Sequence, residues 1–473
     1  MVAAAASREV ASEATPLAGG RRRGCVCGST QRVAVVTCIS SLAEGFDIGV
    51  INGAMILFRE DLHLTDWELG VVLAVFPVGV ALFSPMAGSL LDVIGRKSTL
   101  MLSNVILVIG GLAMAFASSF QAMAFGRIVA GAGVGIGIAA GASYMSEVAP
   151  PRDRGFYGAL EEISVNGGQL CGFAVNMLLL GIPQDWRYMM GAGIVPAGLA
   201  VVPLALPATW SGIAESPRYL QKAGKTEKAR AVLKELLRGD EKEVDSAVRA
   251  WEQEAGAGLA TWGEALEAFC GPQRRAAVAG IGTCVLNVGM GIAMLNVMTT
   301  SLLVETGMPR AAAMQVTMAL GIVKAAVMSA VALFALDSVG RRPLLPASLC
   351  ICCAASALGA VGSLLPRASA WQVGGFCLFV AGFSIGVGPV PWVYMPEVLE
   401  NRLRGKGCGL GFAIARCCVT VQLMTLPVLL PLAGLAGFFA MLLALNLGGF
   451  AFVLCFCPET KGRRLEEMHV LFA

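Results

Sequence analysis

The chain has 473 residues and a formal net charge of +3; 56% of its residues are hydrophobic and only 14% are charged. A soluble globular protein carries about 25% charged residues, so this composition excludes an ordinary soluble domain and indicates a chain that lies largely in lipid. The small net charge also argues against a nucleic-acid partner, which would require a strongly basic surface.

The amino-terminal stretch 1–32 is expected to be a disordered cytosolic tail. Its residues are Ala-rich, polar and basic, and they lack the apolar core of a cleavable signal peptide. A plastid-type targeting segment is an alternative, against which Glu9 and Glu13 argue mildly. Cys25 and Cys27 in this tail are interpreted as free thiols, because no further metal ligands accompany them.

Long apolar runs follow this tail. A transmembrane helix needs about 20 predominantly apolar residues. Runs of that kind lie at approximately 33–58, 68–91, 98–119, 121–146, 156–180, 187–208, 275–304, 310–336, 343–364, 371–396, 406–432 and 434–457. We therefore predict an all-α integral membrane protein with twelve transmembrane helices in two six-helix halves, 33–208 and 275–457.

One long hydrophilic interval, 209–274, separates the two halves and is predicted to be a cytosolic helical linker. Within it, residues 224–255 place apolar side chains at helical spacing on one face, which predicts a pair of surface helices on the cytosolic ends of the bundle. The stretch is too short for a separate catalytic domain. Residues 458–473 are predicted to be a short cytosolic carboxyl tail.

The orientation of the chain follows from its Lys and Arg residues. Most of the 35 lie in the two tails, the linker and alternate loops, whereas the opposite loops hold only Arg59, Arg187, Arg310 and Arg367. Basic loops stay in the cytosol, so we expect both termini and the linker to be cytosolic.

The sequence also repeats itself at the joints between helices. Asp92-Val-Ile-Gly-Arg96-Lys97 recurs as Asp337-Ser-Val-Gly-Arg341-Arg342, and the stretch from Glu147 to Gly155 recurs from Glu397 to Gly405. Glu215 and Glu459 form a third matching pair. Two similar halves with matching charges on one membrane face are typical of a rocker-type transporter.

The repeated charges predict a cytosolic gate. Carboxylate–Arg pairs are directional, and placed across the joint between the halves they would close that side of the protein. The alternative is that they are topology signals and surface ion pairs worth about 0–1 kcal/mol each. We favour the gate because acid and base recur together. Its residues are Asp92, Arg96, Glu147, Arg154, Glu215, Asp337, Arg341, Glu397, Arg404 and Glu459.

A family resemblance becomes specific at these motifs. They are Asp92-x-x-Gly95-Arg96-Lys97, Gly126-Arg127 with the glycines of 131–137, Glu147 to Gly155, Glu215-Ser-Pro-Arg218, Asp337-x-x-Gly340-Arg341-Arg342, Gly388-Pro-Val-Pro-Trp392 and Pro458-Glu459-Thr-Lys-Gly462. Taken in order over residues 33–470, the chain resembles a sugar porter of the major facilitator superfamily, most like the polyol and monosaccharide proton symporters of plants.

The resemblance implies a twelve-helix major facilitator fold that moves a small neutral polyol or sugar by alternating access, with proton symport. It implies a functional monomer in the plasma membrane, without cofactor or metal. One alternative is a facilitative uniporter; another is a sugar sensor, against which the short tail 458–473 argues. No Ser-His-Asp set, metal cluster or P-loop is present in the sequence, so an enzyme is disfavoured.

Charges within the apolar runs predict the proton-coupling residues. A lone charge at the centre of a membrane helix is costly and should face a cavity or a partner. Asp47 lies near the middle of its run, with Glu44 one turn earlier, and Arg127 lies within the fourth run. By resemblance, Asp47 is the proton acceptor and Arg127 its partner; Glu44 can share the proton. The alternative is a permanent salt bridge that only joins two helices.

Polar residues of the fifth run predict a substrate site. Glu162 stands where hexose porters carry a sugar-binding Gln and polyol porters carry Glu, and its carboxylate could accept hydrogen bonds from two hydroxyls. Asn166, Gln169 and Asn176 continue the polar stripe. Hydrogen bonds between helices are the alternative, which we prefer for Asn176, whereas we prefer substrate contact for Glu162 and Asn166.

The second half departs from the family pattern. Sugar porters carry amides and tyrosines in the seventh run. Aligned on Gly291, this chain keeps an amide at Asn287 and has Val288, Ala293, Val297 and Met298 at the other places. In the eleventh run, Ala415 stands in place of an Asn. Trp392 is retained, and an indole face suits the apolar face of a sugar ring; a cavity-lining core aromatic is the alternative. Asn287 and Asn296 could compensate for the lost amides. Lys324 could pair with a carboxylate or with an anionic substrate, and the role of Arg416 stays open.

Glycines alternate along the fourth apolar run at Gly131, Gly133, Gly135 and Gly137. No strand precedes them, so a nucleotide-binding loop is excluded by context. Small residues at that density predict close helix packing within the first half.

Overall fold

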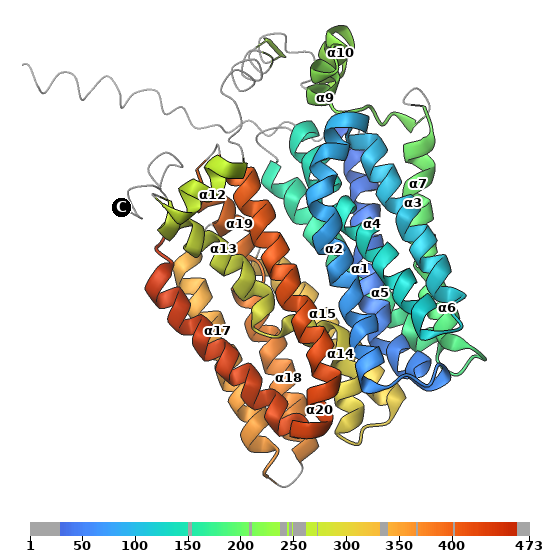
Figure 1. The fold of residues 1–473 in the computed structure, drawn as a ribbon, viewed down its shortest axis with the longest axis vertical. Helices are drawn as coiled ribbons and strands as arrows, with labels where there is room; N and C mark the ends of the chain where they lie inside the picture. The colour runs from blue at the N-terminus through green and yellow to red at the C-terminus, as the bar shows by residue number, and fades with distance from the viewer. Residues whose placement is uncertain are drawn as a thin grey trace, which may run out of the picture.

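The computed structural model describes residues 29–460 except for 150–153, 208–210, 237–243, 246–247, 249–261, 272, 332–338, 366–367 and 401–402. These residues form two groups of helices that stand side by side (Figure 1). The first group contains α1 Ser29–Asp61, α2 Asp66–Ile94, α3 Arg96–Ala115, α4 Phe120–Val148, α5 Arg154–Leu179, α6 Asp185–Ala192 and α7 Ile194–Ala205. The second contains α13 Arg274–Gly289, α14 Ile292–Glu305, α15 Arg310–Ala330, α17 Arg341–Gly362, α18 Ala368–Ile385, α19 Val390–Val398 and α20 Arg404–Phe456.

Three short helices connect the groups: α9 Pro217–Lys222, α10 Thr226–Leu236 and α12 Trp262–Cys270. All three lie at one end of the bundle, which we call the linker side (Figure 1). In α10, Ala229 and Leu233 are buried while the other face is exposed, as expected for a surface helix. The second predicted surface helix falls almost entirely outside the described residues.

The predicted spans are present as long apolar helices. Ten helical segments of the described chain are long and apolar enough to cross a membrane. Two more spans complete the set: α5 is a further helix of 26 residues, and α20, with 53 residues, contains two spans in one. Within α20 the backbone breaks at Gly434, whose φ is +63°, at the boundary that separates the last two apolar runs of the sequence. The twelve-helix, all-α membrane fold is thus confirmed.

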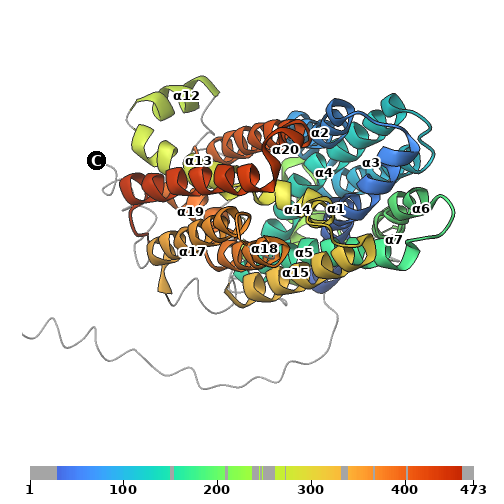
Figure 2. The same ribbon diagram turned by 90° about the horizontal axis from the view of Figure 1, so that it is seen from below.

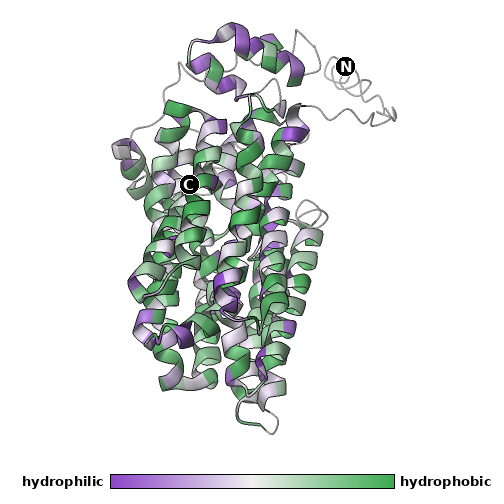
Figure 3. Ribbon diagram, turned by 90° about the vertical axis from the view of Figure 1, so that its right-hand side faces the viewer, coloured by the Kyte–Doolittle hydropathy of each residue, from purple (hydrophilic) through white to green (hydrophobic). Residues whose placement is uncertain are grey.

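The outer faces of the bundle are apolar, in keeping with a lipid environment. Large hydrophobic side chains such as Phe116, Leu178, Leu364 and Leu432 are more than three-quarters exposed. Figure 3 shows hydrophobic residues along the whole length of the packed helices, whereas hydrophilic residues gather in the helices of the linker side.

Close packing in the first group depends on glycine, as the glycine run predicts. A Cβ added at Gly131 would collide with the carbonyl oxygen of Phe76 of α2, and one at Gly133 would lie 2.9 Å from the Leu107 side chain of α3. Glycines also bring α1 against α5, where a Cβ at Gly45 would strike the carbonyl of Val165. The predicted close approach of helices within the first half is therefore confirmed.

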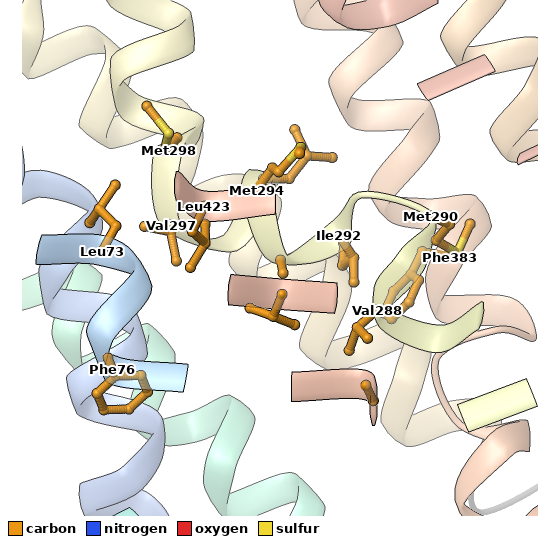
Figure 4. Packing of buried hydrophobic residues seen from close by; sticks show 14 of the residues in the cluster. Leu73, Phe76, Val288, Met290, Ile292, Met294, Val297, Met298, Phe383 and Leu423 are labelled. Atoms are coloured by element: carbon orange, nitrogen blue, oxygen red, sulfur yellow. The ribbon is translucent and has the colours of Figure 1, made fainter. Parts of the chain in front are cut away.

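The two groups meet along a shared hydrophobic core. Seen along the bundle, α1 lies beside α14, α2 beside α20 and α5 beside α15 (Figure 2). In Figure 4, Leu73 of α2 packs close to Val297 of α14 and Leu423 of α20. A Cβ at Gly70 of α2 would lie 2.5 Å from the carbonyl oxygen of Met424, so α2 and α20 are in backbone contact there.

Breaks in the second group's helices position polar groups inside the bundle. Gly291 separates α13 from α14 with a φ of +100°, which is favourable only for glycine. Residues 386–389 separate α18 from α19. Broken membrane helices leave backbone groups free to bind side chains or ligands, and are typical of transporters.

Candidate functional site

A buried ion pair joins α1 and α4 in the first group. Nη1 of Arg127 donates to Oδ2 of Asp47 at 2.7 Å, and the two residues are only 2% and 7% exposed. The guanidinium also lies over the Phe76 ring, 4.3 Å from its centroid. Each charge is thus compensated inside the helix bundle, in the pairing that the family resemblance implies.

Glu44 lies one helical turn before Asp47 on α1 and is 4% exposed. Its carboxylate sits against Gly137 of α4, in space that a Cβ at that glycine would occupy. No hydrogen bond or ion pair joins Glu44 to another residue that the structure describes. A buried carboxylate without such a partner is costly while it is ionised, so Glu44 is a candidate to hold a proton beside the Asp47–Arg127 pair.

Glu162 and Asn166 of α5 contact each other. Nδ2 of Asn166 donates to Oε1 of Glu162 at 3.2 Å and to its backbone oxygen at 2.9 Å. Asn166 also lies 3.9 Å from Sδ of Met328 of α15, so this part of α5 faces the second group. The neighbouring Glu161 has a buried carboxylate oxygen without a partner in the described structure.

A polar cluster further along α5 connects the two groups. Nζ of Lys324 on α15 donates to Oε1 of Gln169 on α5 at 2.9 Å and to Oδ1 of Asn296 on α14 at 3.2 Å. Asn52 of α1 donates to the backbone oxygen of Asn296 at 2.8 Å and accepts from the backbone N–H of Thr300 at 2.9 Å. Sequence reasoning left Lys324 without a partner and did not single out Asn52, although an Asn inside an apolar run is itself a signal.

This cluster borders a small pocket with a cavity volume of about 20 Å³. Gln169, Asn296 and Lys324 line it on the polar side. The other lining residues are Phe173, Leu295, Thr299, Thr317, Leu320, Gly321 and Val380. Ligand pockets for small molecules are commonly apolar with a few placed polar groups, and this pocket has that composition.

The candidate residues of the second group are engaged in contacts within that group. Nδ2 of Asn287 donates to the backbone oxygens of Val387 and Gly388, at 2.7 Å and 3.0 Å, and so fastens the break between α18 and α19. Trp392 of α19 stacks on Phe412 of α20 with centroids 5.2 Å apart. The substrate roles of Asn287 and Trp392 stay predictions.

Asn176 has the structural role that the sequence favours. It is 2% exposed and donates to the backbone oxygen of Gly49 on α1 at 3.4 Å. An interhelical hydrogen bond of this kind fixes α5 against α1, so Asn176 does not belong to the candidate site.

The repeated charges of the linker side form matching caps in the two groups. Glu215 accepts from the backbone N–H groups of Arg96 and Lys97, at 2.9 Å and 3.1 Å, at the start of α3. Glu459 likewise accepts from the N–H groups of Arg341 and Arg342, at 3.2 Å and 2.9 Å, at the start of α17. A carboxylate at a helix N-terminus satisfies free donors and favours the helix dipole.

The adjoining ion pairs repeat as well. Nη2 of Arg96 donates to Oε1 of Glu147 at 2.8 Å, and Nη2 of Arg341 donates to Oε1 of Glu397 at 2.9 Å. A hydroxyl completes each set: Ser216 donates to Glu147 in the first group, and Thr460 donates to Glu397 at 2.7 Å in the second. Burial raises the pKa of Glu215, although the backbone N–H groups of Ser216, Lys97 and Arg96 act in the opposite direction.

These pairs differ from the expected gate in one respect: each described pair joins elements of the same group, and none crosses the joint between the groups. Asp92 pairs at 2.9 Å with Lys222 of the connecting helix α9, which contacts α4 of the first group. In this conformation Arg96 pairs with Glu147 and Arg341 with Glu397, each within one half, and the cross-joint gate stays a prediction. Asp337 and the side chains of Arg154 and Arg404 lie outside the described residues.

The contacts that do cross between the groups lie away from the linker side. Arg310 at the start of α15 forms an ion pair with Glu60 near the end of α1. The bonds of Asn52 to α14 and of Lys324 to Gln169 cross the same joint, as does the close approach of Gly70 to α20. In this conformation the two groups are therefore joined most closely on the side opposite the linker.

Comparison with known proteins agrees with this architecture. A family model described as "Sugar (and other) transporter" matches residues 33–472. Polyol transporter 5 of Arabidopsis thaliana is 29% identical over 471 residues, which cover 93% of this chain and 85% of that protein. The inward-open structure of the xylose transporter XylE from E. coli superimposes with a TM-score of 0.80 at 21% identity, covering 93% of this chain and 99% of that one. The proton:xylose symporter XylE bound to 6-bromo-6-deoxy-D-glucose gives a TM-score of 0.75 at 21% identity, over 94% and 99% of the two chains.

Proposed function

The chain belongs to the family of sugar (and other) transporters, and from this premise we propose that it moves a small neutral polyol or monosaccharide across a membrane by alternating access, with proton symport. The observation that carries the proposal is the Asp47–Arg127 pair, buried between α1 and α4 beside the equally buried Glu44. The similarity to a polyol transporter of Arabidopsis thaliana and to a proton:xylose symporter supports the same assignment.

The buried pair offers a simple means of coupling. While Arg127 contacts Asp47, the carboxylate is charged and has its counter-ion. A proton on Asp47 would remove the charge that holds Arg127, and withdrawal of Arg127 would favour uptake of that proton. The state of the pair and the protonation of Asp47 are therefore linked, and a helix motion that separates α1 from α4 would move a proton with it.

Substrate binding is assigned to the α5 face that carries Glu162, Asn166 and Gln169. The Glu162 carboxylate accepts one hydrogen bond from Asn166 and has acceptor capacity left for substrate hydroxyls. Because Asn166 is near Met328 of α15, a molecule bound at this face would touch both groups. Contact with both groups is what an alternating-access site requires.

The gate and the orientation complete the proposal. The linker side is assigned to the cytosol because most Lys and Arg residues lie there, and the plasma membrane is the proposed location. The capped motifs around Arg96 and Arg341 would each move as part of one rigid half, 33–208 or 275–457. The closure opposite the linker then corresponds to a state whose outer side is shut. The functional unit is proposed to be a monomer.

Uptake into liposomes that contain the purified protein, with an inward proton gradient, tests the coupling. The native protein should accumulate a radiolabelled polyol or monosaccharide above its external concentration, and Asp47→Asn should lose accumulation while still exchanging substrate. Glu227→Gln on the exposed surface of α10 removes a carboxylate elsewhere and should accumulate normally. Equal accumulation by Asp47→Asn would show that Asp47 does not carry the coupled proton, whereas a native protein that only equilibrates its substrate would be a uniporter.

The substrate assignment has its own test. Glu162→Gln keeps the size of the side chain but halves its capacity to accept hydrogen bonds, so polyol affinity should fall about tenfold. Glu161→Gln changes the neighbouring carboxyl, about 100° around the helix, and serves as the matched control. Competition of labelled uptake by unlabelled polyols measures both. If no polyol or hexose competes with the label, the substrate class is wrong.

A further inference from the structure

We propose that the pocket around Lys324 is a subsite for a carboxylate, so that the substrates of this transporter include sugar acids, which carry hydroxyls along the chain and a carboxylate at one end. The inference rests on the proposed transport function and extends its substrate class from neutral polyols and sugars to the corresponding acids. It is carried by the hydrogen bonds of Lys324, by the residues that line its pocket and by the spacing of polar groups on α5.

Lys324 is a cation inside a membrane-spanning helix, and its direct partners are neutral. Its ammonium has three donors and no acceptor. Two of its bonds go to the amide oxygens of Gln169 and Asn296, and no carboxylate of the described chain comes within ion-pair distance. A charge at this depth is costly unless a counter-ion is present, so the geometry leaves a place for an anion.

The pocket presents donors to a ligand. Since the ammonium can only donate, it fixes the oxygens of Gln169 and Asn296 towards itself. The NH₂ groups of both amides have no partner among the described residues, and both residues line the pocket. Asn52 bonds to the backbone of Asn296 and to that of Thr300 one turn later, and so holds this part of α14 in place. A preorganised set of one ammonium and two amide NH₂ groups matches the oxygens of a carboxylate.

The surrounding charges leave Lys324 less compensated than the other cation of this region. Glu44 and Glu162 both act on Arg416 through their charge. Glu162 is the carboxylate that acts on Lys324, and it is shared with Arg416. Lys324 therefore shares its one charged partner with Arg416, and its direct contacts in the described chain are neutral.

The two ends of such a ligand match two positions on α5. Gln169 follows Glu162 by seven residues, so both lie on the same face, two turns and about 10 Å apart along the helix. Glu162 offers an acceptor, which suits hydroxyls, whereas the Lys324 cluster offers donors, which suit a carboxylate. A polyhydroxy acid of about six carbons, with a hydrogen bond at each end, spans this separation; a neutral polyol engages only the first end fully.

Competition of labelled uptake by matched pairs of compounds tests the subsite. Gluconate is compared with glucitol, and glucuronate with glucose, since the members of each pair differ chiefly in the carboxylate. For the native protein, the acid should inhibit at a concentration about tenfold lower than its neutral partner. In Lys324→Gln this ratio should fall close to one, in Lys324→Arg it should persist, and the surface variant Lys228→Gln should retain the native ratio.

The outcomes separate the two proposals. Equal inhibition by both members of a pair in the native protein, or an unchanged ratio in Lys324→Gln, overturns the carboxylate subsite while the transport assignment stands. Absence of saturable uptake of any sugar, polyol or sugar acid overturns the transport assignment itself. Should the variants fold poorly, thermal stabilisation of the native protein by gluconate against glucitol gives the same comparison: the acid should raise the melting temperature more, and equal shifts contradict the subsite.

Discussion

The two halves of this molecule agree closely on the linker side and differ inside the membrane. Arg96 and Glu147 of the first half, with Glu215 of the linker, have the same bonds as Arg341 and Glu397 of the second half, with Glu459 of the carboxyl tail. Deeper in the bundle, the first half has the Asp47–Arg127 pair, whereas no ion pair of the described second half lies at that depth.

The repeated and the unrepeated residues meet two different requirements. Helix N-termini on the linker side face the same physical problem in both halves, namely unsatisfied N–H groups beside basic residues, and they meet it with the same carboxylates. Substrate and proton need a specific site, and a single site between two halves has no reason to be symmetric. The repeated residues therefore describe a scaffold, and the unrepeated ones describe the chemistry.

The largest expected effect comes from breaking the unrepeated pair. Asp47→Ala leaves the Arg127 guanidinium buried without its counter-ion and should lower the free energy of unfolding by about 3–5 kcal/mol. Arg127→Met made in addition removes the stranded charge and should recover much of that loss. Thermal unfolding in detergent measures both. An additive double variant would show that the two residues do not interact.

A smaller loss in the free energy of unfolding is expected when the repeated pairs are broken. Arg96→Ala and Arg341→Ala each leave one carboxylate without its cation, at a cost of about 1–3 kcal/mol. The loss should be greater for Arg96, because the Glu147 side chain is 10% exposed and the Glu397 side chain 21%. The same thermal unfolding measurement applies. A much larger loss for Arg341→Ala would contradict the equivalence of the two caps.

The smallest effect concerns pH. Burial raises the pKa of Glu215 above its value in the unfolded chain, so the folded protein holds this proton more tightly than the unfolded one. The free energy of unfolding should therefore fall, relative to Glu215→Gln, as pH rises from the unfolded pKa to the folded pKa, and the difference should be constant above that interval. Melting temperatures of both proteins across this pH range give the measurement. A difference that grows in favour of the native protein with rising pH would mean that the N–H donors outweigh burial.

Much of the fold could be predicted from the sequence because lipid imposes a simple rule on helix length and polarity. The break at Gly434 coincides with a gap between two apolar runs, and the glycines of α4 pack where small residues were expected. The side-chain partners that depend on the rotation of helices and on contacts between the halves could not be predicted from the sequence. Asn52 and Asn296 meet only because α1 lies beside α14, and no local pattern specifies that contact.

The charged residues at the helix N-termini of the linker side are a second example of partners that the sequence did not specify. Acid and base at matching joints predicted ion pairs correctly in kind, but spacing alone could not tell contacts within a half from contacts between halves. Arg341 has Glu397 of the same half as its partner. From the sequence, Lys324 could pair with a carboxylate or with an anionic substrate. In the folded chain it donates instead to two amide oxygens.

The carboxylates that cap α3 and α17 become available at different stages of biosynthesis. A ribosome delivers Glu215 soon after the first six membrane spans, so the start of α3 can be completed while the second half is still being made. Glu459 emerges only after all the membrane spans, so α17 remains uncapped through the insertion of every later helix. We therefore expect an order of maturation during translation: the half with the Asp47–Arg127 pair is completed first, and the second half is completed only when the residues beyond α20 have left the exit tunnel.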